Sequence, residues 1–416
     1  MPRVGEQCCA SEQSRATGTG TPRATFAAPG IWATTCGSFT RWRWECDRWP
    51  PAGNARCDPG AVISANAAGN TAPPANRRGH DCNQRGPCLN SRACALEQVL
   101  VRCGYNKGMA TRRSGGRSMG MQIRPARAQD REAVFDFCCR MSEGRDYIPQ
   151  VWDEWLADPQ GVLLVATVDD LPVGVVRGAF YLPGEAWLEG MRVSPDHRHQ
   201  GIATTLFQAL LEAVAMRGAR VARLTTAWDN VAVHRMCDRL GFHLAVRLRR
   251  RARTVEAGRP PAELCQLNVK DFEEARQLLH HSRFLAATHG LYSWGGGVWS
   301  AWTEERLRHH LERGEMWGWR SSGRLKAVAF ACPHRRRPWL TEVGLVEGTA
   351  PACTALLAAL AQREGEPEEP APQLRLFLPL QAARLHRAAA AAGYRIPSDW
   401  REIWVFEREL APASER

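Results

Sequence analysis

The sequence predicts an α/β (α+β) fold, a mixed and mostly antiparallel twisted sheet flanked by helices, present twice in one chain. One observation is the junction at residues 187–214, where an alternating strand runs through a polar turn into an amphipathic helix. A second is the order of elements over residues 121–247, which read as strand, helix, helix, three antiparallel strands, helix, strand, helix and strand. Residues 262–416 repeat this order, so we expect two units of related architecture.

Basic residues are concentrated ahead of these two units. The formal net charge is +12, but residues 1–118 carry 16 Lys and Arg against seven Asp and Glu, and the remainder is nearly balanced. The body of the chain therefore gives no sign of a nucleic-acid-binding surface. No apolar region follows Met1 and no segment is long enough to span a membrane. We expect a cytoplasmic protein with neither nucleic acid nor membrane as a partner.

Residues 1–118 do not read as a folded domain. They hold nine of the 15 cysteines, at spacings that match no standard zinc ligand set, and no long apolar period. Three interpretations compete: a disordered basic tail, an unusual metal or disulfide module, and upstream DNA translated from a wrong start codon. The third accounts best for the many Cys and Trp residues. We therefore expect the mature protein to start at Met119, with Met109 and Met121 as other candidates.

The elements of the first unit, residues 119–247, follow from apolar periodicity and turn residues. Its expected strands are apolar or alternating runs at 123–126, 161–168, 172–181, 186–193 and 221–227. Its expected helices have apolar residues three and four apart, at 133–141, 151–156, 202–214 and 230–240. Asp146-Tyr147-Ile148-Pro149 separates the first two helices, since the residue before a proline disfavours helical backbone. A last strand follows Gly241-Phe242.

The turn after the strand at 186–193 has the composition of an anion site. It places a basic residue, a glycine and a small residue in the spacing Arg198-x-x-Gly201-x-Ala203. Glycine and alanine let an anion approach the backbone closely, and the first N–H groups of the following helix have no partner within it. Together with the helix dipole and the Arg198 side chain, these donors would hold a pyrophosphate.

In its strand–turn–helix context this signature resembles that of the GNAT superfamily of acetyl-CoA-dependent N-acetyltransferases. The resemblance covers residues 121–247 and includes Asn230 and Gly241-Phe242, which match the end of a second family block. It implies the GNAT fold, acetyl-CoA as co-substrate and no metal. The cofactor-binding residues that it implies are Met191, Arg192, Val193, Arg198, His199, Gln200, Gly201, Ile202, Ala203, Thr204 and Asn230.

The resemblance also implies where acetyl transfer would take place. In the GNAT family the central strand splays from its neighbour, and its free backbone groups, here those of Met191 and Val193, bind the pantetheine arm and polarise the acetyl carbonyl. Glu189 lies two residues before Met191, so alternation predicts that both side chains share a face. Glu189 is then the expected general base, and an ion pair with Arg177 or Arg192 is the alternative.

Cys237 departs from the family's pattern, which usually has a tyrosine here to protonate the departing thiolate. It lies on the apolar face of the helix at 230–240, so a buried core cysteine is one interpretation and a proton donor the other. Tyr181, Tyr147 and water are further candidate donors, unless the thiolate leaves unassisted.

The segments around Asp146-Tyr147, Trp155 and residues 188–193 are similar to those of histidine N-acetyltransferase-like proteins. This similarity implies a free amino acid or another small amine as substrate, with Asp146, Tyr147, Trp155 and Arg177 as substrate-binding residues. Asp146 would hold a cation on which Tyr147 stacks, and a helix-ending turn is the alternative. The expected function is the transfer of acetyl from acetyl-CoA to a small-molecule primary amine, by direct attack in a ternary complex.

The second unit, residues 262–416, follows an expected linker at 248–261. Its expected strands, again apolar runs between turns, are at 264–267, 315–320, 326–332, 339–346, 374–378 and 402–409. Its expected helices are at 271–281, 350–363 and 381–392, with one more ending at 311. Glu347-Gly348-Thr349-Ala350-Pro351 stands where the anion turn would be, and its acidic residue would repel a pyrophosphate. We therefore expect a degenerate GNAT-like domain that packs against the catalytic one.

Three further segments of this unit are expected to have structural and not functional roles. The Trp- and Gly-rich loop at 294–302 is expected in the core or between the units, with a wall of the substrate pocket as the alternative. Arg335-Arg336-Arg337 is expected to be a solvated turn. The adjacent pairs His280-His281 and His309-His310 each point two ways on a helix and make poor metal sites.

Other functions are left open by the sequence. A protein N-terminus or lysine as acceptor would need an open peptide groove, whereas the second unit is expected to cap the site. A non-catalytic protein that binds acetyl-CoA as a regulatory ligand is a further alternative, kept by Cys237 in place of tyrosine. A homodimer is one assembly that the sequence also allows.

Overall fold

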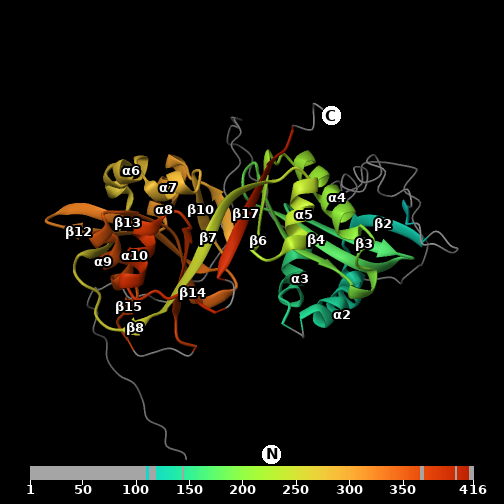
Figure 1. Cartoon of the computed structure of the whole chain (residues 1–416), viewed down its shortest axis with the longest axis horizontal. Coiled ribbons are helices and arrows are strands. Elements are labelled where there is room, and N and C mark those ends of the chain that lie inside the picture. Colours follow the sequence, from blue (N-terminus) through green and yellow to red (C-terminus); the bar gives the residue numbers. More distant parts are fainter. Residues whose placement is uncertain (1–108, 112–118, 143–144, 366–369, 399–400, 412–416) are drawn as a thin grey trace, which may run out of the picture. The chain divides into compact units, whose positions relative to one another are not determined.

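The computed structural model describes residues 109–111, 119–142, 145–365, 370–398 and 401–411 (Figure 1). The expectations about residues 1–108 and 112–118, including the start of the mature protein, lie outside these residues. Met109–Thr111 form strand β1, which pairs antiparallel with the beginning of β2 (Met119–Pro125), so the backbone just ahead of the expected start adds to the sheet. Within the described ranges, no helix combines the length and the apolar character needed to cross a bilayer.

The first half of the structure, residues 119–254, contains the elements expected over residues 121–247. The further strands of this half are β3 (Val162–Val168), β4 (Leu171–Leu182), β5 (Glu185–Val193), β6 (Val221–Ala227) and β7 (His243–Thr254). Its helices are η1 (Ala128–Asp130), α2 (Arg131–Ser142), α3 (Ile148–Ala157), η2 (Pro195–His197), α4 (Ile202–Met216) and α5 (Val231–Arg239). α2 ends at Ser142 and α3 begins at Ile148, so Asp146 and Tyr147 lie between the two helices as predicted. Ile148 and Pro149, expected in the same break, are instead the first residues of α3, where proline is tolerated.

The second half, residues 255–411, contains the predicted strands and helices in the predicted order, together with short elements that were not predicted. Its strands are β8 (Glu256–Ala257), β9 (Leu264–Gln266), β10 (Leu291–Gly295), β11 (Val298–Ala301), β12 (Met316–Ser321), β13 (Arg324–His334), β14 (Arg337–Gly348), β15 (Gln362–Arg363), β16 (Gln373–Pro379) and β17 (Glu402–Glu409). Its helices are η3 (Val269–Asp271), α6 (Phe272–His280), α7 (Arg283–Ala287), α8 (Glu304–Glu312), α9 (Ala350–Leu360) and α10 (Ala383–Ala391). The Trp- and Gly-rich segment, expected as a loop, forms the hairpin β10–β11, because Gly295, Gly296 and Gly297 all adopt positive φ at its turn.

Thirteen strands from both halves form one sheet in the order β1-β2-β3-β4-β5-β6-β17-β7-β16-β14-β13-β12-β9, and β10 with β11 and β8 with β15 form two separate two-stranded sheets. Only two neighbouring pairs of this sheet, β5 with β6 and β14 with β16, run parallel. The predicted α/β class with a mixed, mostly antiparallel sheet is therefore confirmed.

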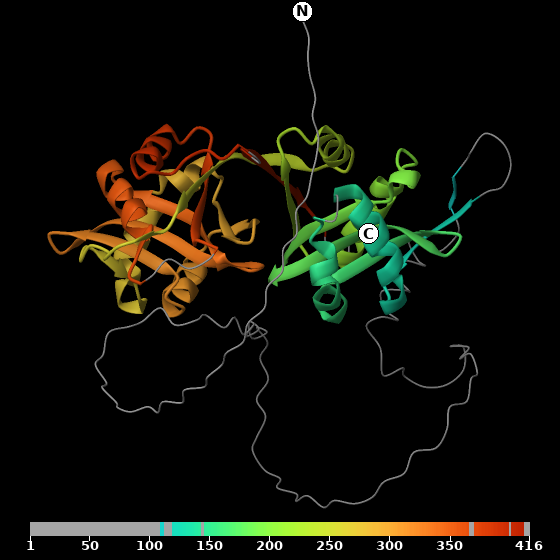
Figure 2. The ribbon, with the colours of Figure 1, turned by 90° about the horizontal axis from the view of Figure 1, so that it is seen from below.

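The two halves exchange their last strands. β17, the last strand of the chain, lies between β6 and β7, whereas β7 pairs on its other side with β16 of the second half (Figure 1). In Figure 2 the yellow-green β7 runs from the green strands toward the orange strands of the second half. Residues 248–254, expected as part of a linker, are thus a paired stretch of β7. Since each half closes its sheet with a strand of the other, neither has a complete sheet alone.

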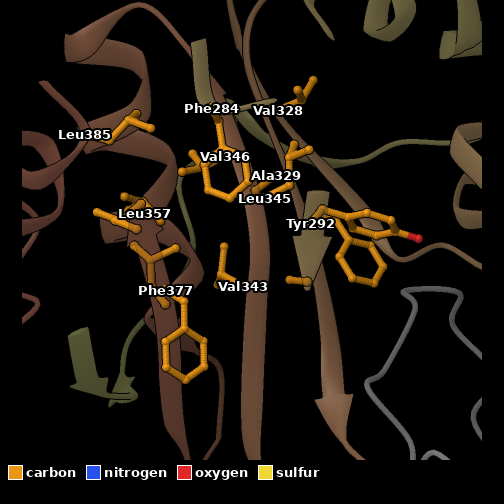
Figure 3. Close-up of a cluster of buried hydrophobic side chains, with 14 of the residues drawn as sticks. Phe284, Tyr292, Val328, Ala329, Val343, Leu345, Val346, Leu357, Phe377 and Leu385 are labelled. Carbon is orange, nitrogen blue, oxygen red and sulfur yellow. The ribbon is translucent and has the colours of Figure 1, made fainter. Parts of the chain in front are cut away.

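Apolar clusters cover both faces of the first half. One lies against α4 and α5 and includes Leu206, Leu210 and Val214, the face that the helical spacing predicts. The other lies under α2 and α3 and includes Phe137 and Trp152. The cluster of the second half is centred on Val343, Leu345 and Val346 of β14, as Figure 3 shows, and it extends to Ala179 and Trp187 of the first half. Trp299 of β11 is also fully buried there, which confirms core packing for the Trp-rich segment.

Candidate active site

The parallel strands β5 and β6 separate near their middle. They pair only where Glu185–Trp187 meets Val221–Arg223, and beyond these residues Leu188–Val193 and Leu224–Ala227 have no common ladder. The backbone of β5 is therefore not engaged by β6 around Met191 and Val193. This is the separation expected from the family resemblance, and it leaves main-chain donors and acceptors for an extended ligand.

The turn between β5 and α4 has the geometry of an anion site. Gly201 has φ 79° and His199 has φ 61°, so the chain turns sharply just before the helix begins at Ile202. The first helical hydrogen bond joins the Thr205 N–H to the Gly201 carbonyl at 3.1 Å, and the preceding N–H groups stand outside the helical pattern. Arg198 and Gly201 are exposed. Open backbone donors and an accessible guanidinium fit a pyrophosphate, so Arg198 to Thr204 could hold that part of acetyl-CoA.

A bulge at Gly190 changes the faces of β5. Glu189 lies opposite Arg177 in β4, whereas Arg192 lies opposite the residue two positions before Arg177. One extra residue is thus accommodated at Gly190, which has φ 71°. Glu189 and Arg192 therefore share a face, and Met191 packs on the α4 side. The expectation that Glu189 and Met191 share a face is wrong, because simple alternation does not survive a bulge.

Glu189 is surrounded by hydrogen-bond donors. Its Oε1 accepts from Arg177 Nη1 at 2.8 Å and from the Tyr181 hydroxyl at 3.0 Å, and its Oε2 accepts from Arg336 Nη2 at 3.3 Å. The ion pair with Arg177 that was the alternative to a general base is present, and the one with Arg192 is not. Burial raises the pKa of Tyr181, and the nearby Glu189 carboxylate raises it further. The phenol therefore keeps its proton at neutral pH.

Asp146 is buried and is paired with a cation of the chain itself. Its Oδ2 accepts from Arg192 Nε at 2.6 Å, and its Oδ1 accepts from the Ile148 N–H at 3.0 Å. The Arg192 guanidinium carbon also lies 5.6 Å from the centre of the Tyr147 ring. The cation expected on Asp146 and Tyr147 is thus supplied by Arg192 in this structure. Burial raises the pKa of Tyr147 to about 12.

Trp155 forms the floor of the same region. A Cβ added to Gly190 would lie 2.6 Å from the Trp155 ring, so the bulge glycine also permits this close contact. The Arg177 guanidinium carbon lies 5.1 Å from the centre of that ring, and Arg177 Nη2 donates to Asp158 at 2.6 Å. Of the expected substrate-binding residues, all four therefore converge on one face of β5.

The triple-arginine turn between β13 and β14 also reaches this face, and its interpretation as a solvated turn is wrong. The Arg336 guanidinium carbon lies 4.6 Å from the centre of the Tyr147 ring and 5.7 Å from that of Trp155. That of Arg335 lies 4.0 Å from the Tyr181 ring. Only Arg337 is exposed. No feature of the sequence indicates this contact, since local composition does not say toward which neighbour a turn points.

Two expected site residues have structural roles here. Cys237 is fully buried in the cluster against α4 and α5, and burial raises the pKa of its thiol to about 12. Its position favours the core interpretation. Asn230 caps α5: its Oδ1 accepts from the Val233 N–H at 3.4 Å, and its Nδ2 donates to Thr226 Oγ1 at 3.0 Å. No group of three His, Cys, Asp or Glu side chains suited to a metal ion occurs among the described residues.

Residues of the first half match known proteins in sequence. Residues 130–242 match the model of the acetyltransferase (GNAT) family. A histidine N-acetyltransferase of Oreochromis niloticus is 28% identical over 109 residues, which cover 26% of this chain and 32% of that protein. The matched stretch thus spans about a third of that relative's length.

Two solved structures are also similar. One is a GCN5-related N-acetyltransferase from Sphaerobacter thermophilus, with a TM-score of 0.47, 14% identity, and coverage of 70% of this chain and 96% of that one. The other is described as a putative acetyltransferase from Thermoplasma acidophilum, with a TM-score of 0.43, 12% identity, and coverage of 69% and 99%. The family match spans the separation of β5 and β6, the anion turn and the Gly241-Phe242 block. Residues 130–242 therefore carry a domain of the GNAT acetyltransferase family.

Proposed function

We propose that the first half transfers the acetyl group of acetyl-CoA to the primary amine of a small molecule, by direct attack within a ternary complex. The observation that carries the small-molecule assignment is the turn at Arg335 and Arg336, which covers the acceptor side of Glu189. A polypeptide lying across that side would have to displace two guanidiniums packed on Tyr147 and Tyr181. A small amine needs only a pocket among these side chains.

The cofactor would lie along the opening between β5 and β6. Its pyrophosphate would take the N–H groups between Arg198 and Thr204, and its pantetheine arm would follow the backbone of Met191 and Val193. Acetyl-CoA supplies the thioester carbonyl that the amine attacks. The protein's contribution is to hold that carbonyl beside the acceptor, which turns a two-body encounter into a reaction within one complex.

Glu189 is the group that would take the proton from the acceptor ammonium. It is the carboxylate at the centre of the acceptor side. Arg177 and Tyr181 fix its Oε1, so Oε2, which accepts from Arg336 Nη2 at 3.3 Å, is the atom that would meet the amine. Cys237 has no part in this proposal, because its thiol is enclosed by apolar side chains. The thiolate would take its proton from Tyr181 or from water.

The relative named histidine N-acetyltransferase supports a free amino acid as the acceptor. We further propose that the second half is a degenerate repeat whose role is to close the acceptor side. Both proposals can be tested by measuring free-thiol release from acetyl-CoA with histidine, other free amino acids, polyamines and peptides as acceptors. We expect release with one or more free amino acids and none with peptides. Release with peptides alone would contradict the proposal.

A further inference from the structure

Arg336 is a residue of the second half placed in the acceptor site of the first. It lies in the turn between β13 and β14, and its backbone N–H donates to His334 Nδ1 at 3.1 Å, which anchors the turn. Its guanidinium lies near the rings of Tyr147 and Trp155 and near Glu189 Oε2. A planar guanidinium on aromatic rings is held in orientation with its N–H edge available.

The Arg336 guanidinium is weakly paired compared with its neighbours. Arg177 donates to two carboxylates at 2.6 and 2.8 Å, and Arg192 donates to Asp146 at 2.6 Å. Among the described residues, the Arg336 side chain makes one hydrogen bond, at 3.3 Å, to an oxygen of a carboxylate that Arg177 already binds. Charge-assisted hydrogen bonds of this kind are usually about 2.7–2.9 Å long. Its side chain is 28% exposed, and among the described residues Glu189 is the carboxylate with which it forms an ion pair.

We propose that Arg336 binds an anionic group of the acceptor, a carboxylate or a phosphate, and that this contact draws it away from Glu189. The inference rests on the proposed function and deepens it. An anion that takes two parallel N–H bonds from Arg336 offers a better partner than the shared oxygen at 3.3 Å. Glu189 Oε2 then becomes open to the ammonium group of the same molecule.

The ammonium passes one proton to Glu189 Oε2, and the neutral amine attacks the thioester carbonyl. The new C–N bond forms as the C–S bond breaks, and the thiolate takes a proton from Tyr181 or water. The nitrogen gives up its second proton as the amide forms, and this proton restores the donor. An amine without an anionic group leaves Arg336 on Glu189, where its positive charge opposes the incoming ammonium. Arg336 is thus a substrate-binding and positioning residue.

The test compares Arg336→Gln with Arg337→Gln. Arg337 is the next residue of the same turn, but it is exposed and its guanidinium carbon lies 5.8 Å from the Trp339 ring, away from the acceptor site. Acceptors are free amino acids, their carboxamides, and the pair ethanolamine and phosphoethanolamine, which separates carboxylate from phosphate. We expect the intact protein to favour the anionic member of a pair by about 10- to 100-fold in kcat/KM.

In Arg336→Gln this preference should fall to nearly one, chiefly through KM for the anionic acceptor, while Arg337→Gln keeps it. Arg336→Lys should restore part of it, because the charge remains. Equal preference in Arg336→Gln and Arg337→Gln, with acetyl transfer intact, would overturn the inference and leave the proposed function standing. Calorimetric binding of the same acids to the coenzyme A complex tests Arg336 without turnover. A coenzyme A complex that binds the acids equally with and without Arg336 would also overturn it.

Discussion

The two halves differ in the turn that leads from the central strand into the next helix, which is α4 in the first half and α9 in the second. In the first half, β5 leads through the exposed Arg198 and Gly201 into α4, and the N–H groups before Thr205 are left for an external anion. In the second half, β14 leads through Glu347 into α9. The Glu347 side chain is buried and already fills the role of an anion. One acidic residue in the turn therefore separates an entrance with open backbone donors from a closed one.

The hydrogen bonds of Glu347 show how complete this closure is. Its Oε1 accepts from the Gly348 N–H and from Arg384, both at 2.9 Å. Its Oε2 accepts from the Ser282 hydroxyl at 2.9 Å and from the Phe284 N–H at 3.0 Å. Four donors that could serve a bound anion are thus committed to an internal carboxylate. A pyrophosphate would have to displace it, against its charge.

The central strands of the two halves, β5 and β14, also differ in how deeply the residues at their ends are buried. β14 and β16 pair over Leu340–Val343, and β14 then continues to Gly348. The residues beyond this pairing, Leu345 and Val346, are fully buried in the cluster of Figure 3. Met191 and Val193 follow the separation of β5 from β6 and are only half-buried. The residues beyond the separation are therefore more deeply buried in the second half than in the first.

Removal of β17 should have the largest effect, and it tests whether the two halves can fold independently of each other. A chain ending at residue 400 leaves the facing edges of β6 and β7 without their shared partner. We expect loss of cooperative folding in both halves and loss of coenzyme A binding, measured by circular dichroism and calorimetry. Changing exposed Glu409 to Gln, at the end of the same strand, is the matched control. A truncated protein that still binds coenzyme A would show that the exchange is dispensable.

Charge reversal in the open entrance should have the next largest effect. Arg198→Glu with Gly201→Asp places two negative charges where a pyrophosphate would bind, so coenzyme A affinity should fall by at least about 100-fold while the fold is kept. Gln208→Glu, exposed farther along α4, is the control. Calorimetry should give one site per chain in the intact protein and none in the double variant. Two sites in the intact protein would mean that the second half is not closed.

Glu347→Ala probes the closed entrance. It removes the acceptor from Arg384 and from three other buried donors, so we expect a loss of about 3–5 kcal/mol in the free energy of unfolding. Arg198→Ala, at the open entrance, should change this free energy by less than about 0.5 kcal/mol because the side chain is exposed. Denaturant unfolding measures both. Similar losses in the two variants would erase the distinction between the entrances.

Local elements and the anion turn could be predicted from sequence because their causes are local. The spacing of Leu206, Leu210 and Val214 places α4, and Arg198 with Gly201 marks its entrance. The strand exchange could not be predicted, since β7 and β17 have comparable apolar alternation and nothing local says which edge each one joins. These choices depend on contacts between residues far apart in the chain.

The sequence predicts which residues of the first half form the proposed acceptor site, but not which of these side chains pair with one another. The expected substrate-binding residues Asp146, Tyr147, Trp155 and Arg177 do converge. However, a glycine within a strand pattern does not reveal whether a bulge is present. The sequence therefore predicts that Glu189 shares a face with Met191, whereas in the structure it shares a face with Arg192. Arg336 was missed because a basic turn looks alike whether it meets solvent or a carboxylate of the other half.

The last prediction uses a position at which the two halves can be matched directly. The Phe242 N–H donates to the Cys237 carbonyl at 2.9 Å, and the Tyr394 N–H donates to the Ala389 carbonyl at 2.9 Å. His234 and His386 contact the carbonyls of Ala227 and Pro379, each at 3.1 Å. Ala389 therefore occupies in the second half the place of Cys237 in the first, and both are fully buried.

Cys237→Ala makes the first half like the second at this position. We expect a loss of about 1–2 kcal/mol in the free energy of unfolding, from a small cavity, with most acetyl transfer retained. Because burial raises the pKa of the thiol from 9.0 to about 12, the native state favours the neutral form. Its contribution to stability is complete below pH 9 and is lost as the pH rises toward 12, so the variant should lose less stability over that range than the intact protein. Turnover reduced about 100-fold at unchanged stability would instead make Cys237 the proton donor, and Cys353→Ala, at another buried thiol, controls for cavity formation alone.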